Sequence, residues 1–415
     1  MKIFFLSLSA VVLIFSGCVS SGFNISSSDG VKDKETTSIS FDDIQFNRIE
    51  TKDIGIVLDT QTDLSPRAVL ETDNGDVILI TVEAKAQEYF GPSDIVLVKI
   101  DPDGNVIWKK KHQTPVDDMM AGVSDAIMTS DGNIVLCGWI GKLYPHVPAL
   151  WKFNSEGEFL WLDTAKDNSS YSSVIEDDEG HYLLLSENDN ILKLVKYAGN
   201  GILEGNIIDF SVYNISEEYK RNLFVDGFCQ LPDNKGYMVT GEFSAEDLKS
   251  DLYLAKFNSD FEMQWTKVFD YAGWEKGANI QLLEDNTLLS TALLRNGSSF
   301  SKDITLLQKL DLDGEVLWKK EYYNMGSLKL DSKDSHWIIG STYKDNNVIL
   351  FNSDVHDVVK WVISLGPDLA KYIRSVKILN DGSAIFIGNQ PLTHDSEWVT
   401  TVVYKLDPDT GKMLW

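Results

Sequence analysis

An all-β fold built from one repeated four-stranded unit is predicted by three features of the sequence. Turns rich in Asp, Asn and Gly recur at intervals of 47 to 57 residues. Apolar residues alternate on both sides of these turns, and a lysine and a tryptophan recur nine residues apart. Because seven such units follow one another, the sequence predicts a seven-bladed β-propeller with four-stranded antiparallel blades. A stacked solenoid is the competing architecture, but its repeats are usually shorter.

The first hairpin of each unit is predicted from its turn. Asn-Gly and Asp-Gly sequences supply the positive φ angles that tight hairpins need. The seven turns are Asp73-Asn74-Gly75, Asp131-Gly132, Asp178-Glu179-Gly180, Asp233-Asn234-Lys235-Gly236, Asp285-Asn286, Asp334-Ser335 and Asp381-Gly382.

The third and fourth strands are predicted from the lysine and the tryptophan. Nine residues separate Lys99 from Trp108, Lys152 from Trp161, Lys256 from Trp265 and Lys309 from Trp318, and ten separate Lys405 from Trp415. The third unit has Gly205 at the tryptophan position, and the sixth has Trp361 after a degenerate third strand. We expect each tryptophan to fill the wedge between neighbouring blades, where a large ring buries much apolar area.

The closure of the ring is predicted from the register of the repeat. A fourth strand precedes each first strand, and counting back from Gly75 leads to the apolar segment 54–58. This segment is expected to join the last blade beside the short 412–415 strand, which would hide the open sheet edges.

The repeat resembles that of quinoprotein-like propellers, the PQQ-like repeat. The segment from Asp407 to Trp415 has the pattern Asp-x-x-Thr-Gly-x-x-x-Trp, and the likeness extends from Leu64 to the end of the chain. The resemblance implies the fold. Its non-enzymatic members include an envelope lipoprotein that helps to assemble outer-membrane barrels, while its enzymes oxidise alcohols or sugars with pyrroloquinoline quinone. Those enzymes have an adjacent cysteine pair, which this chain lacks, so no cofactor is expected.

The N-terminal residues predict export and a lipid anchor. Lys2 precedes a short apolar run, and Phe15-Ser16-Gly17-Cys18 resembles a bacterial lipobox with Cys18 as the lipidated residue. An ordinary secretory signal is the alternative. We therefore expect a signal peptide at 1–17, a flexible Ser-rich tether at 18–40, the propeller at 41–415, and a bacterial cell-envelope location facing the periplasm or the exterior.

Charge and cysteines limit the partners. The formal net charge is −26, with 63 acidic residues against 37 Lys and Arg. Such a chain repels phosphate backbones, so no nucleic-acid partner is expected.

The remaining cysteines, Cys137 and Cys229, belong to different units, and two buried thiols are more plausible than a disulfide.

The longer connections of a propeller gather on one face, where binding groups collect. Aromatic and charged side chains in these connections suit a protein partner or a sugar ring, although they could also pack against neighbouring loops. The candidates are Tyr89, Phe90, Trp139, Tyr144, His146, Trp274, Arg295, Tyr343, His394 and Trp398.

A second candidate surface is the wall of the axial channel. The inner strands carry polar residues early in their sequence, namely Asp125, Ser173, Asp226, Asn279 and Ser375. An acidic pair there could bind a cation, but a hydrated wall explains it more simply.

No motif for catalysis stands out. The six histidines are scattered without metal-ligand spacing, and no nucleophile elbow or phosphate loop is present. The Asp-x-Asp-Gly turns at 101–104 and 311–314 lack the glutamate that completes a calcium loop. The sequence thus favours a non-catalytic envelope lipoprotein that binds a protein partner. The alternative is a propeller that binds or cleaves carbohydrate.

Overall fold

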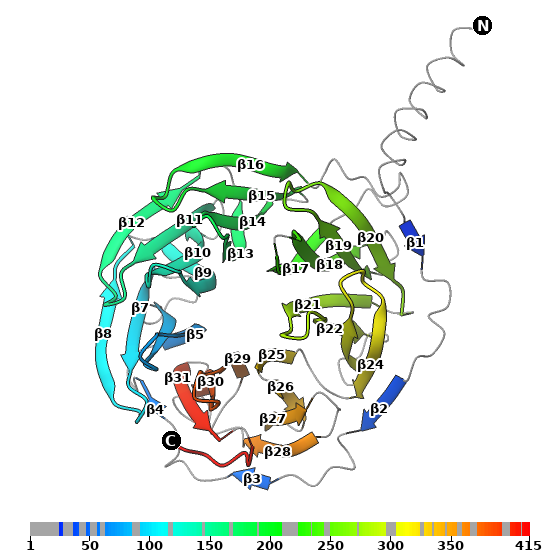
Figure 1. Cartoon of the computed structure of the whole chain (residues 1–415). Helices are drawn as coiled ribbons and strands as arrows, with labels where there is room; N and C mark the ends of the chain where they lie inside the picture. Colours follow the sequence, from blue (N-terminus) through cyan, green and yellow to red (C-terminus); the bar gives the residue numbers. More distant parts are fainter. Residues whose placement is uncertain are drawn as a thin grey trace, which may run out of the picture.

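The computed structural model describes residues 25–27, 36–40, 47–49, 56–58, 63–84, 92–114, 119–142, 146–165, 169–188, 191–209, 223–233, 235–244, 250–271, 274–295, 304–323, 328–333, 336–344, 347–354, 359–365, 372–391, 399–407 and 409–415. These residues form strands arranged as a ring around a central axis (Figure 1). Among them, no helix is long and apolar enough to cross a membrane.

Each repeat unit begins with a strand near the axis and continues outward. The innermost strands are β5 (Asp63–Glu71), β9 (Met120–Met128), β13 (Ser170–Glu176), β17 (Leu223–Gln230), β21 (Trp274–Leu282), β25 (Leu328–Lys333) and β29 (Tyr372–Ile378). The second strands are β6 (Val77–Ala84), β10 (Ile134–Gly141), β14 (Tyr182–Asn188), β18 (Tyr237–Ser244), β22 (Leu288–Arg295), β26 (His336–Lys344) and β30 (Ala384–Pro391).

The outer half of each unit follows. The third strands are β7 (Ser93–Ile100), β11 (His146–Phe153), β15 (Ile191–Tyr197), β19 (Ser250–Phe257), β23 (Ile304–Leu310), β27 (Asn347–Asp354) and β31 (Val399–Leu406). The outermost strands are β8 (Val106–His112), β12 (Phe159–Thr164), β16 (Leu203–Asp209), β20 (Met263–Phe269), β24 (Val316–Tyr323) and β28 (Val359–Leu365). Within each unit the neighbouring strands are antiparallel, as predicted.

The number of blades differs from the prediction. The described strands form six hydrogen-bonded sheets, so with a blade counted as one continuous sheet the propeller has six blades, and the prediction of seven is wrong. One sheet has ten strands, because β19 pairs in parallel with β21 through Ser250 and Trp274. This pairing joins the repeat units β17–β20 and β21–β24 into one sheet. A sequence repeat counts units, and it does not show where two units become hydrogen-bonded.

Three short strands that precede the first repeat unit lie at the outer rim of the ring (Figure 1). The strands β1 (Ile25–Ser27), β2 (Thr36–Ser40) and β3 (Asn47–Ile49) pair in parallel with β20, β24 and β28. Two of these strands fall within the stretch predicted as a tether. The outer edges of three consecutive repeat units are therefore covered by the chain itself.

The ring is closed through the last sheet. The strand β4 (Ile56–Val57) pairs with Val402 and Val403 of β31, which is the pairing predicted for 54–58. The C-terminal residues return to the same edge, where Leu414 donates its N–H to the carbonyl of Lys405 at 2.8 Å. The two segments thus share the edge of β31 end to end.

The apolar core lies between neighbouring sheets. One buried cluster contains Ile80 and Leu97 of the first sheet together with Leu136 and Phe153 of the second. Another unites Val96 with Ile385 and so joins the first sheet to the last. Cys137 in β10 and Cys229 in β17 lie in different sheets as free thiols, and burial raises the pKa of the Cys229 thiol to about 12.

The recurrent lysine connects turns and sheets. Lys152 is buried, and its Nζ lies 2.9 Å from Asp131 Oδ2 in its own first turn and 2.7 Å from the hydroxyl of Tyr182 on the next sheet. The equivalent ion pairs are Lys99–Asp76 at 3.2 Å, Lys309–Asp285 at 2.6 Å and Lys405–Asp381 at 3.2 Å. The lysine therefore supports the hairpin turn.

Candidate functional site

Six of the innermost strands contain a β-bulge in their middle. One extra residue interrupts the pairing with the second strand in each case. The extra residues are Arg67, Ser124, Ser172, Asp226, Ala278 and Arg374. A bulge bends its strand and re-aims a side chain, and bulges are common beside binding sites.

The bulges surround a pocket of about 370 Å³. Several repeat units contribute to its wall. The lining residues are Arg67, Ala68, Val69, Ser124, Asp125, Ala126, Ser172, Ser173, Val174, Ile175, Gly227, Phe228, Asn279, Arg374, Ser375 and Val376. We call this the axial pocket. Its volume falls within the range of ligand pockets, roughly 300–1,000 Å³.

Four of the residues predicted for the channel wall line the axial pocket: Asp125, Ser173, Asn279 and Ser375. The carboxylate of Asp125 is used within the fold, because its Oδ2 accepts hydrogen bonds from Ser173 Oγ at 2.9 Å and from the N–H of Val174 at 3.0 Å. For Asp226 the structure describes the strand but not the side chain. A hydrated wall therefore stays the prediction for these residues, with cation binding by an acidic pair as the alternative.

The two arginines of the pocket were not predicted. Arg67 in β5 and Arg374 in β29 occupy the same bulge position in the first and last innermost strands. Burial, followed by the positive charge of Arg374, lowers the pKa of Arg67. The sequence did contain a signal, because Arg67-Ala68-Val69 and Arg374-Ser375-Val376 have the same pattern at the same place in the repeat.

A second cavity of about 420 Å³ lies between the outer parts of the first two sheets. Its wall is mainly apolar, with Ile95, Trp151, Phe153 and Phe159 among the lining residues. His112 lies at its edge against Phe153, and burial lowers the pKa of this histidine. The axial pocket has the greater concentration of charged and hydrogen-bonding groups and is the better candidate for recognition.

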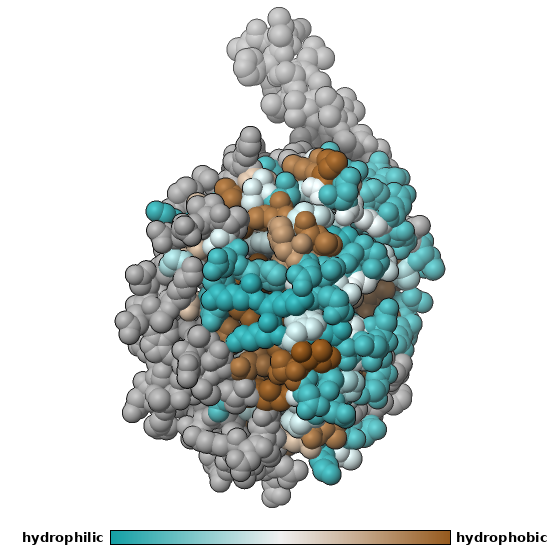
Figure 2. Space-filling view, turned by 90° about the vertical axis from the view of Figure 1, so that its left-hand side faces the viewer, coloured by the Kyte–Doolittle hydropathy of each residue, from teal (hydrophilic) through white to brown (hydrophobic). Residues whose placement is uncertain are grey.

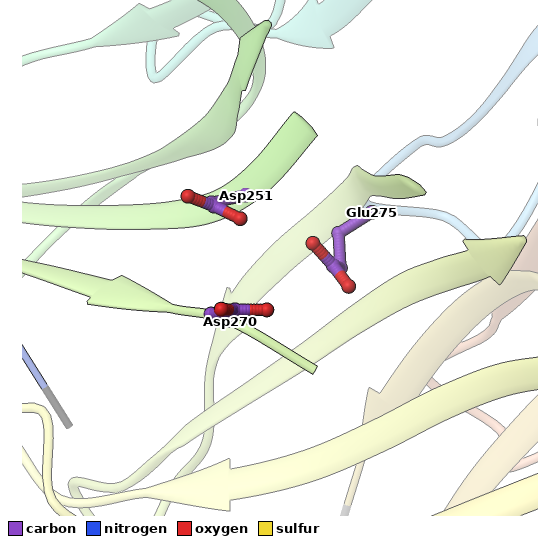
Figure 3. Close-up of side chains that lie close together, drawn as sticks. All are labelled: Asp251, Asp270 and Glu275. Atoms are coloured by element: carbon purple, nitrogen blue, oxygen red, sulfur yellow. The ribbon is translucent and has the colours of Figure 1, made fainter. Parts of the chain in front are cut away.

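Three carboxylates meet where the ten-stranded sheet joins its two units (Figure 3). Asp251 in β19, Asp270 just after β20 and Glu275 in β21 each offer an oxygen, and these oxygens lie within 4.8 Å of one another. Such a set could hold a hard cation such as Ca²⁺, which prefers oxygen ligands. The sequence did not indicate this cluster, because the parallel pairing of β19 with β21 brings it together.

The residues predicted for the loop face are only partly described. The rings of Trp139 and His146 lie 5.1 Å apart, so these two are in contact. For Trp274, Arg295 and Tyr343 the structure describes the strand but not the side chain. The rest lie outside the described residues: Tyr89, Phe90, Tyr144, His394 and Trp398. A shared binding face therefore stays a prediction.

Exposed apolar side chains recur on the outer rim. Adjacent pairs lie at the start of three successive outermost strands, Val106-Ile107, Phe159-Leu160 and Ile202-Leu203, each side chain 44–62% exposed. Figure 2 looks onto the side of the ring that carries β8 and β12 and shows apolar patches separated by hydrophilic ones. Apolar groups that recur in this way suit a protein contact.

Solved structures with a similar fold include two lyases. A streptogramin B lyase aligns with a TM-score of 0.51 and 13% identity over 85% of this chain and 96% of that one. A virginiamycin B lyase from Staphylococcus aureus aligns with a TM-score of 0.50 and 11% identity over 83% and 96%. A protein from Lactobacillus plantarum gives 0.51 and 11% over 81% and 94%. At these identities the likeness shows the propeller fold alone.

No protein-family model matches the sequence. No curated protein matches it either. Membership of the quinoprotein-like family therefore stays a prediction.

Proposed function

We propose that this chain is an exported, lipid-anchored β-propeller that binds a polar ligand in the axial pocket and does not convert it. The lipobox-like sequence ending at Cys18 supports export and anchoring. The axial pocket supports binding. Fold likeness to lyases does not imply lyase activity, because one propeller fold serves many functions.

The single observation that carries the proposal is the set of bulged innermost strands around one pocket. Bulges interrupt pairing and add nothing to the ladder, so their repetition around the axis needs another reason. They bring serine hydroxyls, an amide and two guanidinium groups to a common space. Hydroxyl and amide groups recognise ligands with several hydroxyl groups, and this favours a sugar-like molecule.

Binding can be tested by filling the pocket. In the Ser124→Trp variant an indole should occupy the pocket, whereas Ser155→Trp places the same residue on an exposed turn. Glycan arrays followed by calorimetry should show binding to the wild type and to Ser155→Trp, with loss of binding in Ser124→Trp. Unchanged binding by Ser124→Trp would place the ligand elsewhere. New reducing ends released from the bound glycan would contradict a non-catalytic role.

Lipid anchoring has its own test. Expression of the whole chain in a bacterial host should give a membrane-bound form that partitions into detergent, and Cys18→Ala should release it. A Cys18→Ala protein that still sediments with membranes would contradict the anchor.

A protein partner is the second candidate, and the exposed rim pairs favour it. The chain already adds its own strands to the outer edges of β20, β24 and β28, so a partner strand could pair with an outer edge in the same way. A photo-crosslinking residue at Leu160 should capture one stoichiometric partner in cells, and the same residue at exposed Lys235 should not. Identical capture at both positions would contradict a rim interface.

A further inference from the structure

We propose that the axial pocket selects ligands that carry a carboxylate group, and that Arg67 and Arg374 bind this group together. The inference rests on the proposed function, because it names the ligand class of the same pocket. It is carried by the position, surroundings and chemistry of the two arginines.

The position of the two residues is equivalent. Each is the extra residue of a bulge, and β5 and β29 are neighbours across the junction where the ring closes (Figure 1). Both side chains line the axial pocket. Two guanidinium groups from separate sheets therefore face one space.

Among the described residues, no acidic side chain acts on the charge of Arg67. Burial and the charge of Arg374 are the influences that lower its pKa, and within the described residues its buried Nε has no hydrogen-bond partner. Arginine keeps its charge despite such a shift. The two guanidinium groups repel each other, so holding both positive charges in one pocket costs free energy. A bound anion would reduce this repulsion.

The carboxylate of Asp125 in the same pocket is not among the groups that shift the pKa of Arg67. Asp125 uses its Oδ2 to bind Ser173 and the backbone of Val174, and it thereby links two sheets. A hydrogen bond orients the side chain of Arg374, because its Nε donates to Asn389 Oδ1 at 3.1 Å. The pocket thus holds a hydrogen-bonded guanidinium beside a half-buried one.

The chemistry favours a carboxylate on a hydroxylated ligand. The planar fork of a guanidinium matches the two oxygens of a carboxylate. Ser124, Ser172 and Ser375 in the same wall offer hydrogen bonds to hydroxyl groups. A monosaccharide acid combines both features in a size that such a pocket accepts.

The test uses D-galacturonate, its neutral methyl ester and D-galactose as calorimetric probes at low ionic strength. The wild type should bind the acid at least tenfold more tightly than the ester. Arg67→Gln and Arg374→Gln should each weaken binding of the acid about tenfold, with little change for the ester. Lys235→Gln removes the same charge from an exposed turn and should bind as the wild type does.

Thermal melting gives a second measurement that does not depend on the sugar. Inorganic phosphate should stabilise the wild type more than chloride does at equal ionic strength, and Arg67→Gln should lose this difference. Without ligand, Arg67→Gln should melt at a higher temperature than the wild type, because one of two repelling charges is gone. Arg374 is exposed, so Arg374→Gln should fold normally. It therefore tests the same pocket even if Arg67→Gln does not fold.

The outcomes separate the two proposals. Equal affinity of the wild type for the acid, the ester and galactose would overturn the carboxylate inference and leave the binding function intact. The inference is also overturned if galacturonate does not bind the wild type and phosphate does not raise its melting temperature. The binding function would then be judged by the Ser124→Trp experiment.

Discussion

The indole of Trp108 covers the α-carbon of Gly157 on the neighbouring sheet. A Cβ at Gly157 would lie 2.6 Å from the ring, closer than real Cβ atoms approach. The same relationship recurs around the ring in the pairs Trp161–Gly201, Trp265–Gly314, Trp361–Gly411 and Trp415–Gly104. The tryptophans therefore lie between neighbouring units, as the sequence predicted. Glycine is favoured in these turns for two reasons: it adopts a positive φ without strain, and without a Cβ it lets the indole ring pack against the backbone.

These two demands can be separated by alanine substitutions. Gly157 has a φ of +73° and lies under Trp108, whereas Gly132 has a φ of +76° with nothing within 4 Å of an added Cβ. Gly132→Ala should lose only about 1 kcal/mol of unfolding free energy, from backbone strain. Gly157→Ala should lose about 1–3 kcal/mol more, since the ring must move. Urea denaturation measures both, and equal losses would show that the ring contact contributes nothing.

At the junction between the third and fourth repeat units, the positions of the aromatic residue and the glycine are exchanged. The third unit has Gly205 in place of the tryptophan, and the fourth has Phe261 at the turn position with a φ of +62°. Phe261 stacks on Tyr237 at 4.7 Å and packs against a cluster that includes Leu185 and Leu194 of the third unit. The aromatic ring at this junction thus comes from the turn.

Replacing Phe261 tests whether this packing outweighs the backbone strain. Phe261→Gly relieves the positive φ but removes the ring, so we expect a net loss of about 1–2 kcal/mol in unfolding free energy. Asn286 also has a positive φ, 59°, in an exposed turn, and Asn286→Gly should be neutral or slightly stabilising. The prediction fails if both glycine variants are stabilised alike in chemical denaturation.

The ion pair of Asp131 with Lys152 should make stability depend on pH in acid. Burial alone would raise the pKa of Asp131, but hydrogen bonds from Thr129, Lys152 and Asn133 outweigh it and hold the pKa well below its usual range. A carboxyl group with a lowered folded pKa stabilises the fold above its unfolded pKa, about 3.9, and loses this contribution as the pH falls further.

The stability advantage of the wild type over Asp131→Asn should therefore be constant between pH 5 and 7 and shrink below about pH 4. Asp73→Asn alters an exposed turn aspartate and serves as the control. Melting temperatures across this pH range measure the effect. An advantage that persists unchanged at pH 2 would contradict the assigned pKa direction.

Trp415 adds to the contacts that close the ring. Trp415 packs over Gly104, and its Nε1 donates to the carbonyl of Pro102 at 3.1 Å, so the last sheet is bound to the first. Trp415→Ala should lower the unfolding free energy by about 2 kcal/mol, through lost apolar burial and one hydrogen bond. Leu414→Ala, at a side chain 49% exposed, should cost much less. Equal effects of the two variants in thermal melts would show that the contacts of Trp415 do not stabilise the junction.

The sequence by itself determined the repeat unit, its four antiparallel strands, its turns and the strand that closes the ring. These features depend on contacts within about fifty residues or on one recurring register, so turn residues and apolar alternation are enough to predict them. The tertiary structure alone decided that Ser250 pairs with Trp274 and merges two units, which changed the number of sheets. It also brought Arg67 and Arg374 into one pocket, although they are 307 positions apart in the sequence (374 − 67). A local pattern cannot show such neighbours, because they meet only when the ring has closed.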